Sequence, residues 1–91
     1  MSKPETQPTT EAPTYQMHML CCTATILDEI KAGLPQTDIA MSYGLAIRSA
    51  AAGADDPDWQ TINRAILARW SMAGLERIKK KAWKLAKGDP A

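Results

Sequence analysis

Helix-starting and helix-ending residues divide the chain into segments, and within each segment the apolar residues recur with an α-helical period. Gly33 and Pro35 follow the first segment, Gly53 follows the second, and Ser71 precedes the last. Gly is favoured directly after a helix and Ser directly before one. No stretch alternates apolar and polar residues as a half-buried strand does. The sequence therefore predicts an all-α fold, a small bundle of about four helices.

The apolar stripes locate the expected helices. Helices over residues 15–32 and 36–52 are followed by an acidic sequence at 55–58, where Pro57 fits the first position of a third helix. Carboxylates before that position complement the free N–H groups and the helix dipole. A last helix follows Ser71 and ends at Gly88. The stripes comprise Met19, Cys22, Ile26 and Ile30; Ile39, Tyr43, Ala46, Ile47 and Ala50; Trp59, Ile62, Ile66 and Trp70; and Leu75, Ile78, Ala82 and Leu85.

The N-terminal fourteen residues differ in composition from the rest of the chain. They contain Pro4, Pro8 and Pro13 among Thr, Gln and Glu, and no large apolar residue after Met1. Such a segment buries too little apolar surface to offset the chain entropy lost on folding. We therefore expect residues 1–14 to form a disordered tail and residues 15–91 to form one helical domain.

The chain lacks the patterns of membrane and secreted proteins. No stretch approaches the roughly 18 apolar residues of a membrane-spanning helix, and the N-terminus lacks the basic and apolar regions of a signal peptide. Adjacent Cys21 and Cys22 do not provide a disulfide framework. We expect a cytoplasmic protein with reduced thiols and no membrane partner.

Charge is distributed very unevenly along the chain. Residues 64–87 hold eight of the eleven Lys and Arg and a single acid, Glu76, so a block of net charge −5 is followed by a block of +7. Like charges gathered on one surface repel one another unless a partner neutralises them. This asymmetry favours an anionic partner.

The last helix separates its charges from its apolar residues. On a helical projection the cations lie opposite Leu75, Ile78 and Leu85, and Trp83 lies at the border. The basic side fits either a solvated outer face of a bundle or a surface that neutralises nucleic-acid phosphates. Trp83 fits either an anchor for a partner or a cover for the edge of the core. The candidate phosphate contacts are Arg77, Lys80, Lys81, Lys84 and Lys87.

Residues 26–53 carry a pattern that resembles the helix-turn-helix of DNA-binding domains. The matching positions are Gln36, Ile39, Ala40, Gly44 and Leu45. In that family the small residue lets two helices approach, and the Gly forms a sharp turn between them. The resemblance implies a turn at Gly44 and a recognition helix after Leu45.

The expected recognition helix is poor in polar residues. Arg48 and Ser49 are the side chains there that can hydrogen-bond a base, and Ala and Gly occupy most of residues 46–53. A single continuous helix over residues 36–52 fits the same apolar stripe. Both interpretations remain open at the level of sequence.

A second resemblance is to the small accessory proteins of temperate phages and mobile elements. It depends on the Pro- and Thr-containing leader and on the helical body with Trp59, Ile62 and Asn63, then Arg69 to Ser71, then Ile78 and Lys79. Proteins of that type regulate DNA or block a host protein by surface contact.

Residues for catalysis are sparse. His18 is the only histidine, no Gly-rich phosphate loop is present, and adjacent Asp28 and Glu29 point in different directions from a helix. His18, Cys21 and Cys22 fall short of the four ligands that a structural zinc site normally needs. We expect a protein that is not an enzyme and holds no cofactor or metal.

Two functional hypotheses follow. The first is a small DNA-associated protein, a regulator of the helix-turn-helix type, whose basic helix contacts the phosphates of duplex DNA while Arg48 and Ser49 approach a groove. The second is a protein-binding accessory or inhibitor that applies the same basic surface and Trp83 to an acidic or nucleic-acid-binding protein.

Overall fold

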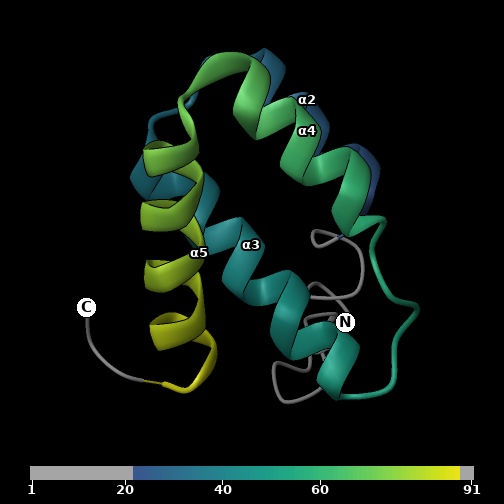
Figure 1. Ribbon diagram of the computed structural model, residues 1–91. Helices are drawn as coiled ribbons and strands as arrows, with labels where there is room; N and C mark the ends of the chain where they lie inside the picture. Colours follow the sequence, from purple (N-terminus) through teal and green to yellow (C-terminus); the bar gives the residue numbers. More distant parts are fainter. Residues whose placement is uncertain (1–21, 89–91) are drawn as a thin grey trace, which may run out of the picture.

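The computed structural model describes residues 22–88, and four helices make up most of this region. Their bounds are α2 Thr23–Lys31, α3 Gln36–Ala51, α4 Trp59–Arg69 and α5 Met72–Ala86 (Figure 1). The all-α prediction is confirmed. The predicted tail at 1–14 and the predicted helical residues 15–21 lie outside the described residues. No helix between residues 22 and 88 is long and apolar enough to cross a bilayer.

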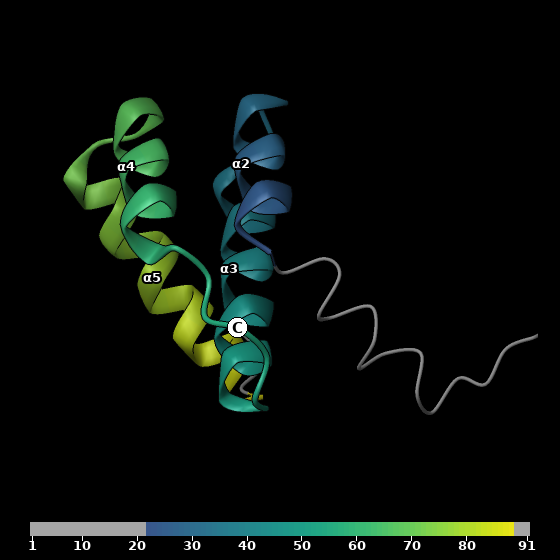
Figure 2. The same cartoon turned by 90° about the vertical axis from the view of Figure 1, so that its right-hand side faces the viewer.

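The helices form two layers. Figure 2 shows α2 and α3 in one layer and α4 and α5 in the other. The most extensive packing is between α3 and α5, and α2 packs on α4. Each helix therefore covers the apolar face of a helix in the opposite layer.

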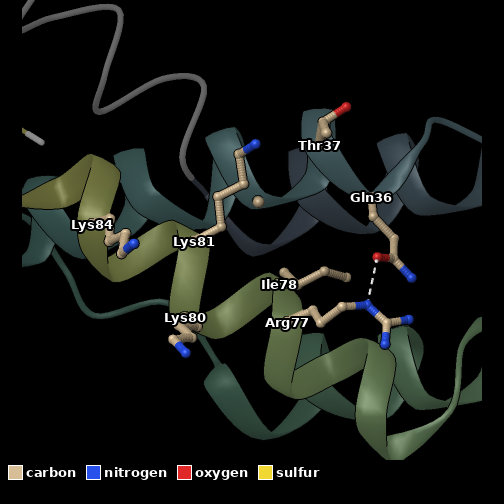
Figure 3. Close-up of a pocket in the computed structure, with 8 residues that line it drawn as sticks. Gln36, Thr37, Arg77, Ile78, Lys80, Lys81 and Lys84 are labelled. Atoms are coloured by element: carbon tan, nitrogen blue, oxygen red, sulfur yellow. Dashed lines mark hydrogen bonds between the residues drawn. The ribbon is translucent and has the colours of Figure 1, made fainter. Parts of the chain in front are cut away.

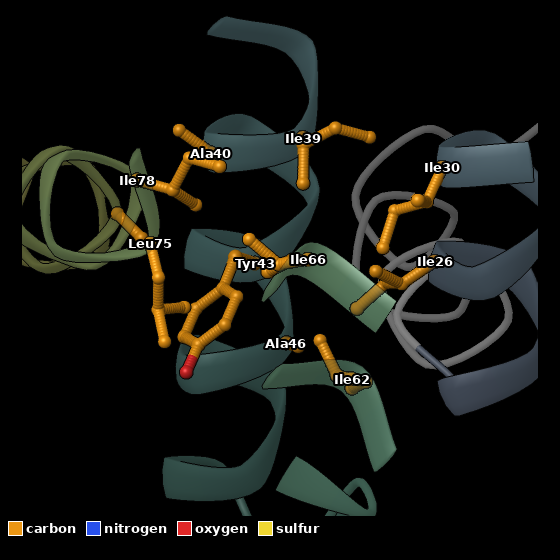
Figure 4. Close-up of a cluster of buried hydrophobic side chains, with 11 residues drawn as sticks. Ile26, Ile30, Ile39, Ala40, Tyr43, Ala46, Ile62, Ile66, Leu75 and Ile78 are labelled. Carbon is orange, nitrogen blue, oxygen red and sulfur yellow. The ribbon is translucent and has the colours of Figure 1, made fainter. Parts of the chain in front are cut away.

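The core is built mainly from isoleucines contributed by all of these helices (Figure 4). Burying one such side chain stabilises a fold by about 1.5–3 kcal/mol. Trp59 and Trp70 were expected in the core stripe of α4, yet they pack against the core while only partly buried. The largest fully buried side chains are Ile26, Ile39, Ile62, Ile66 and Ile78.

Side chains cap the starts of three helices. Ser71 accepts a hydrogen bond from the Gly74 N–H at 3.2 Å, as its sequence position predicts. Asp58 accepts one from the Thr61 N–H at 3.1 Å. The predicted start at Pro57 is wrong: Asp58 is the cap residue, because its carboxylate reaches the first turn, and Pro57 is buried ahead of the helix. Cys22, predicted in an apolar stripe, is exposed and caps α2.

Gly44 lies inside an unbroken α3 and not at a turn. The helix runs without interruption from Gln36 to Ala51, so the sharp turn implied by the helix-turn-helix resemblance is wrong and the continuous helix is confirmed. A Cβ atom at Gly44 would lie 2.9 Å from the carbonyl oxygen of Ala82 and 3.3 Å from Cβ of Leu85. Gly44 therefore serves close packing of α3 on α5.

Replacing Gly44 with Ala tests this packing. In an ordinary helix interior that change stabilises by about 1 kcal/mol. Here the added methyl meets the backbone of α5, so we expect Gly44→Ala to lower the free energy of unfolding by about 1–3 kcal/mol. Urea unfolding followed by circular dichroism measures the change. A stabilised variant would show that the two helices are not in close contact.

Candidate nucleic-acid interface

Helix α5 presents its basic side chains to solvent because its opposite face is in the core. Leu75, Ile78 and Ala82 are buried, whereas the cations predicted as phosphate contacts lie on the rest of the helix surface. Lys81 is half-buried at the edge of this surface. The exposed members are Arg77, Lys80, Lys84 and Lys87.

A groove separates the first turn of α3 from this basic surface (Figure 3). Its volume is about 350 Å³, which lies within the usual range for ligand-binding clefts. Figure 3 shows the Lys81 side chain extending toward α3 on the side of Thr37. We call it the basic groove; its lining residues are Gln36, Thr37, Ala40, Arg77, Ile78, Lys80, Lys81 and Lys84.

The charge of the basic groove is not neutralised within the described part of the chain. No carboxylate is among the lining residues. Arg77 Nε donates a hydrogen bond of 3.4 Å to Gln36 Oε1, which is a neutral acceptor. Between residues 22 and 88 the ion pair present is Lys79 with Glu76 at 4.0 Å, outside the groove. The groove therefore holds a concentration of positive charge that an anion would relieve.

The groove lining suits phosphate recognition. Guanidinium and ammonium groups form strong, charge-assisted hydrogen bonds with phosphate oxygens. The Gln36 amide and the Thr37 hydroxyl add neutral donors from α3, opposite the cations of α5. Gln36 and Thr37 were missed as site residues, because only the packing of α3 on α5 brings them to the cations.

The remaining predicted contacts lie elsewhere. Arg48 is exposed and lines a second depression with Lys87 and Trp83, near the C-terminal ends of α3 and α5. Ser49 is 4% exposed. Ser49 lines a separate cavity together with Asp55 and Asp56, and the carboxylates of these two residues repel phosphates. Ser49, predicted among the nucleic-acid contacts, is therefore buried, because the continuous α3 turns this residue inward.

The guanidinium group of Arg69 stabilises the fold. Its NH1 and NH2 groups donate to the carbonyl oxygens of Ile30 and Gly33 at 3.1 and 3.0 Å. Its guanidinium also lies 4.5 Å from the centre of the Trp70 ring. Arg69 thus joins the end of α4 to the end of α2.

Comparison with protein-family models, with curated proteins and with solved structures gives no match. Among residues 22–88, no three His, Cys, Asp or Glu side chains come together as metal ligands would.

Two substitutions distinguish Arg69, whose hydrogen bonds stabilise the fold, from Lys84, which lines the basic groove. We expect Arg69→Gln to lower the free energy of unfolding by about 1–3 kcal/mol, because two carbonyl groups lose a charged donor. Lys84→Gln, on the exposed face of α5, should change it by less than about 0.5 kcal/mol. Thermal unfolding of both variants measures the difference. Equal losses would mean that Lys84 also holds the fold together.

Proposed function

We propose that this protein is a non-enzymatic DNA-associated protein that binds backbone phosphates through the basic groove and the exposed face of α5. The observation that carries the proposal is the groove itself, which is lined by Arg77, Lys81 and Lys84 and has no carboxylate among its lining residues. Lys and Arg that neutralise phosphates release condensed counterions, and this release is the main source of sequence-independent affinity for DNA.

The length of the basic surface indicates that it contacts only a few phosphates of a DNA strand. The ten residue steps from Arg77 to Lys87 extend about 15 Å along a helix axis. That length corresponds to about four successive phosphates of one strand, at about 3.4 Å of axial rise each. Arg48 and Lys87 line the depression at the far end of α5 and extend the positive surface in that direction.

We do not propose that the protein recognises the identity of DNA bases. The residues on α3 that follow Gly44 belong to the same helix, and the polar side chain of Ser49 is buried. Phosphate contacts fix the position of a protein on DNA and carry no direct sequence information. We therefore expect binding that varies little with DNA sequence and strongly with salt.

A protein partner with an acidic surface is the second candidate. The observation that favours it is Trp83, which is 51% exposed beside the cations of α5. Trp is one of the residue types enriched among the residues that dominate protein interfaces. This candidate takes the lead if the protein does not bind duplex DNA at low salt.

Two charge-matched double variants test the DNA proposal. Lys81→Gln with Lys84→Gln removes two cations from the basic groove, whereas Lys31→Gln with Arg64→Gln removes two exposed cations from α2 and α4. Duplex affinity is measured over a range of salt concentrations. In the groove variant the slope of log K against log salt should flatten by about 0.9 for each phosphate that is no longer neutralised. The control variant should keep a slope within about 0.5 of the original.

A variant with Lys80, Lys81, Lys84 and Lys87 all changed to Gln extends this test. Helix propensity and the buried face of α5 are nearly unchanged, so the variant should remain folded. Its affinity for duplex DNA at low salt should fall by at least about tenfold, since several phosphates are left without a cation. A folded variant with unchanged affinity and unchanged salt slope would remove the DNA proposal.

A further inference from the structure

A hollow on the other side of α5 gathers most of the aromatic side chains of the described region. It lies where α3, α4 and α5 meet, and its volume is about 480 Å³. Its lining includes the aromatic residues Tyr43, Trp59 and Trp83 and one cation, Lys79. We call it the aromatic hollow; its other lining residues are Ile47, Ala50 and Ala51.

One wall of the aromatic hollow is held in place by the fold. The rings of Tyr43 and Trp59 are 4.8 Å apart between centroids and tilted by 37°. The Tyr43 hydroxyl donates to Asn63 Oδ1 at 2.9 Å, and burial raises the pKa of this phenol above its ordinary value. Tyr43 is therefore a neutral ring with a fixed orientation.

Trp83 also lines the aromatic hollow, and it is the most exposed of the aromatic side chains there. Half of its surface is open to solvent, although it lies on the same helix as the buried Ile78 and Ala82. An indole ring left exposed beside other aromatic side chains offers a flat apolar face to a planar ligand.

The charge around the aromatic hollow is positive. Lys79 lines the hollow, and Lys87, which is four residues after Trp83, lines the neighbouring depression together with Trp83. No carboxylate lines the hollow. The pair between Lys79 and Glu76 is partly exposed and 4.0 Å long, and pairs of this kind are weak enough for a phosphate to displace. A ligand that carries both a planar ring and a phosphate fits this combination.

We propose that the aromatic hollow receives an unpaired nucleobase of the strand whose phosphates lie on α5. This inference rests on the proposed function and narrows it to nucleic acid with unpaired bases. Bases in an intact duplex are stacked inside the helix, and they reach an aromatic side chain only where the strand is single or interrupted. Stacking on aromatic rings tolerates any base, so it agrees with a surface that lacks base-reading side chains.

The wild-type protein gives a first test without any substitution. The probes are a thymidine oligonucleotide of about twelve nucleotides, a strand of the same length with abasic sugars, and a duplex. If a base stacks in the hollow, the thymidine strand should bind about tenfold or more tightly than the abasic strand, which has the same phosphates. An RNA strand of the same length distinguishes an RNA partner from a DNA partner. Equal affinity for the thymidine and abasic strands would overturn the inference.

Variants at Trp83 then locate the effect. Trp83→Leu keeps an apolar side chain but removes the ring, so affinity for the thymidine strand should fall about tenfold while affinity for the duplex changes less than about twofold. Trp83→Phe keeps a ring, should retain most of the affinity, and confirms that the site is folded. Leu67→Ala, which shortens a partly exposed apolar side chain on α4, is the matched control and should change neither affinity.

The outcomes separate this inference from the proposed function. If the groove lysine variants weaken every probe but Trp83→Leu affects the duplex and the single strand equally, the hollow does not take a base and phosphate binding stands. If no probe binds the wild-type protein at low salt, both proposals fail together. In that case Trp83 is assigned to a protein partner.

Discussion

The close contact between α3 and α5 at Gly44 is the constraint on which the proposed sites depend. The two helices run in the same direction, since Gln36 lies beside Gly74 at one end and Gly44 beside Ala82 at the other. Because Gly44 has no Cβ atom, the backbone of α3 can approach the backbone of α5 closely at this position. This approach brings Gln36 and Thr37 to the basic groove on one side of α5. On the other side it brings Tyr43 and Ile47 to the aromatic hollow.

Much of the fold follows from local patterns in the sequence. Ser71 caps α5, α3 spans nearly its expected range, and Ile62, Ile66, Ile78 and Ala82 are buried as their spacing predicts. These features can be predicted from sequence because helix caps and apolar stripes depend on neighbours within one or two helical turns. Pro57 shows the limit of this reasoning, since Asp56 and Asp58 are both suitable cap residues and only the folded backbone selects Asp58.

The candidate site depends on contacts that local patterns do not contain. Gly44 fits equally well as a turn residue and as a point of close approach, because the partner that decides between them, Ala82, lies far along the chain. The cations of α5 were found from sequence because they occur on one helix. Gln36 and Thr37 join them only through packing, and Ser49 is turned inward only because α3 continues past Gly44.

The most direct test of the account is to map where DNA touches the protein by two-dimensional NMR during titration with a short duplex. We predict that the largest shifts occur at the backbone amides of Gln36 and Thr37, and from Arg77 along α5 to its C-cap residue Lys87. Lys31 on α2 and Arg64 on α4 carry the same charge as the groove cations but lie outside the groove, so their signals should change little. Shifts of equal size at Lys31, Arg64 and the groove residues would show general attraction to positive charge, and would contradict a phosphate site built by α3 and α5.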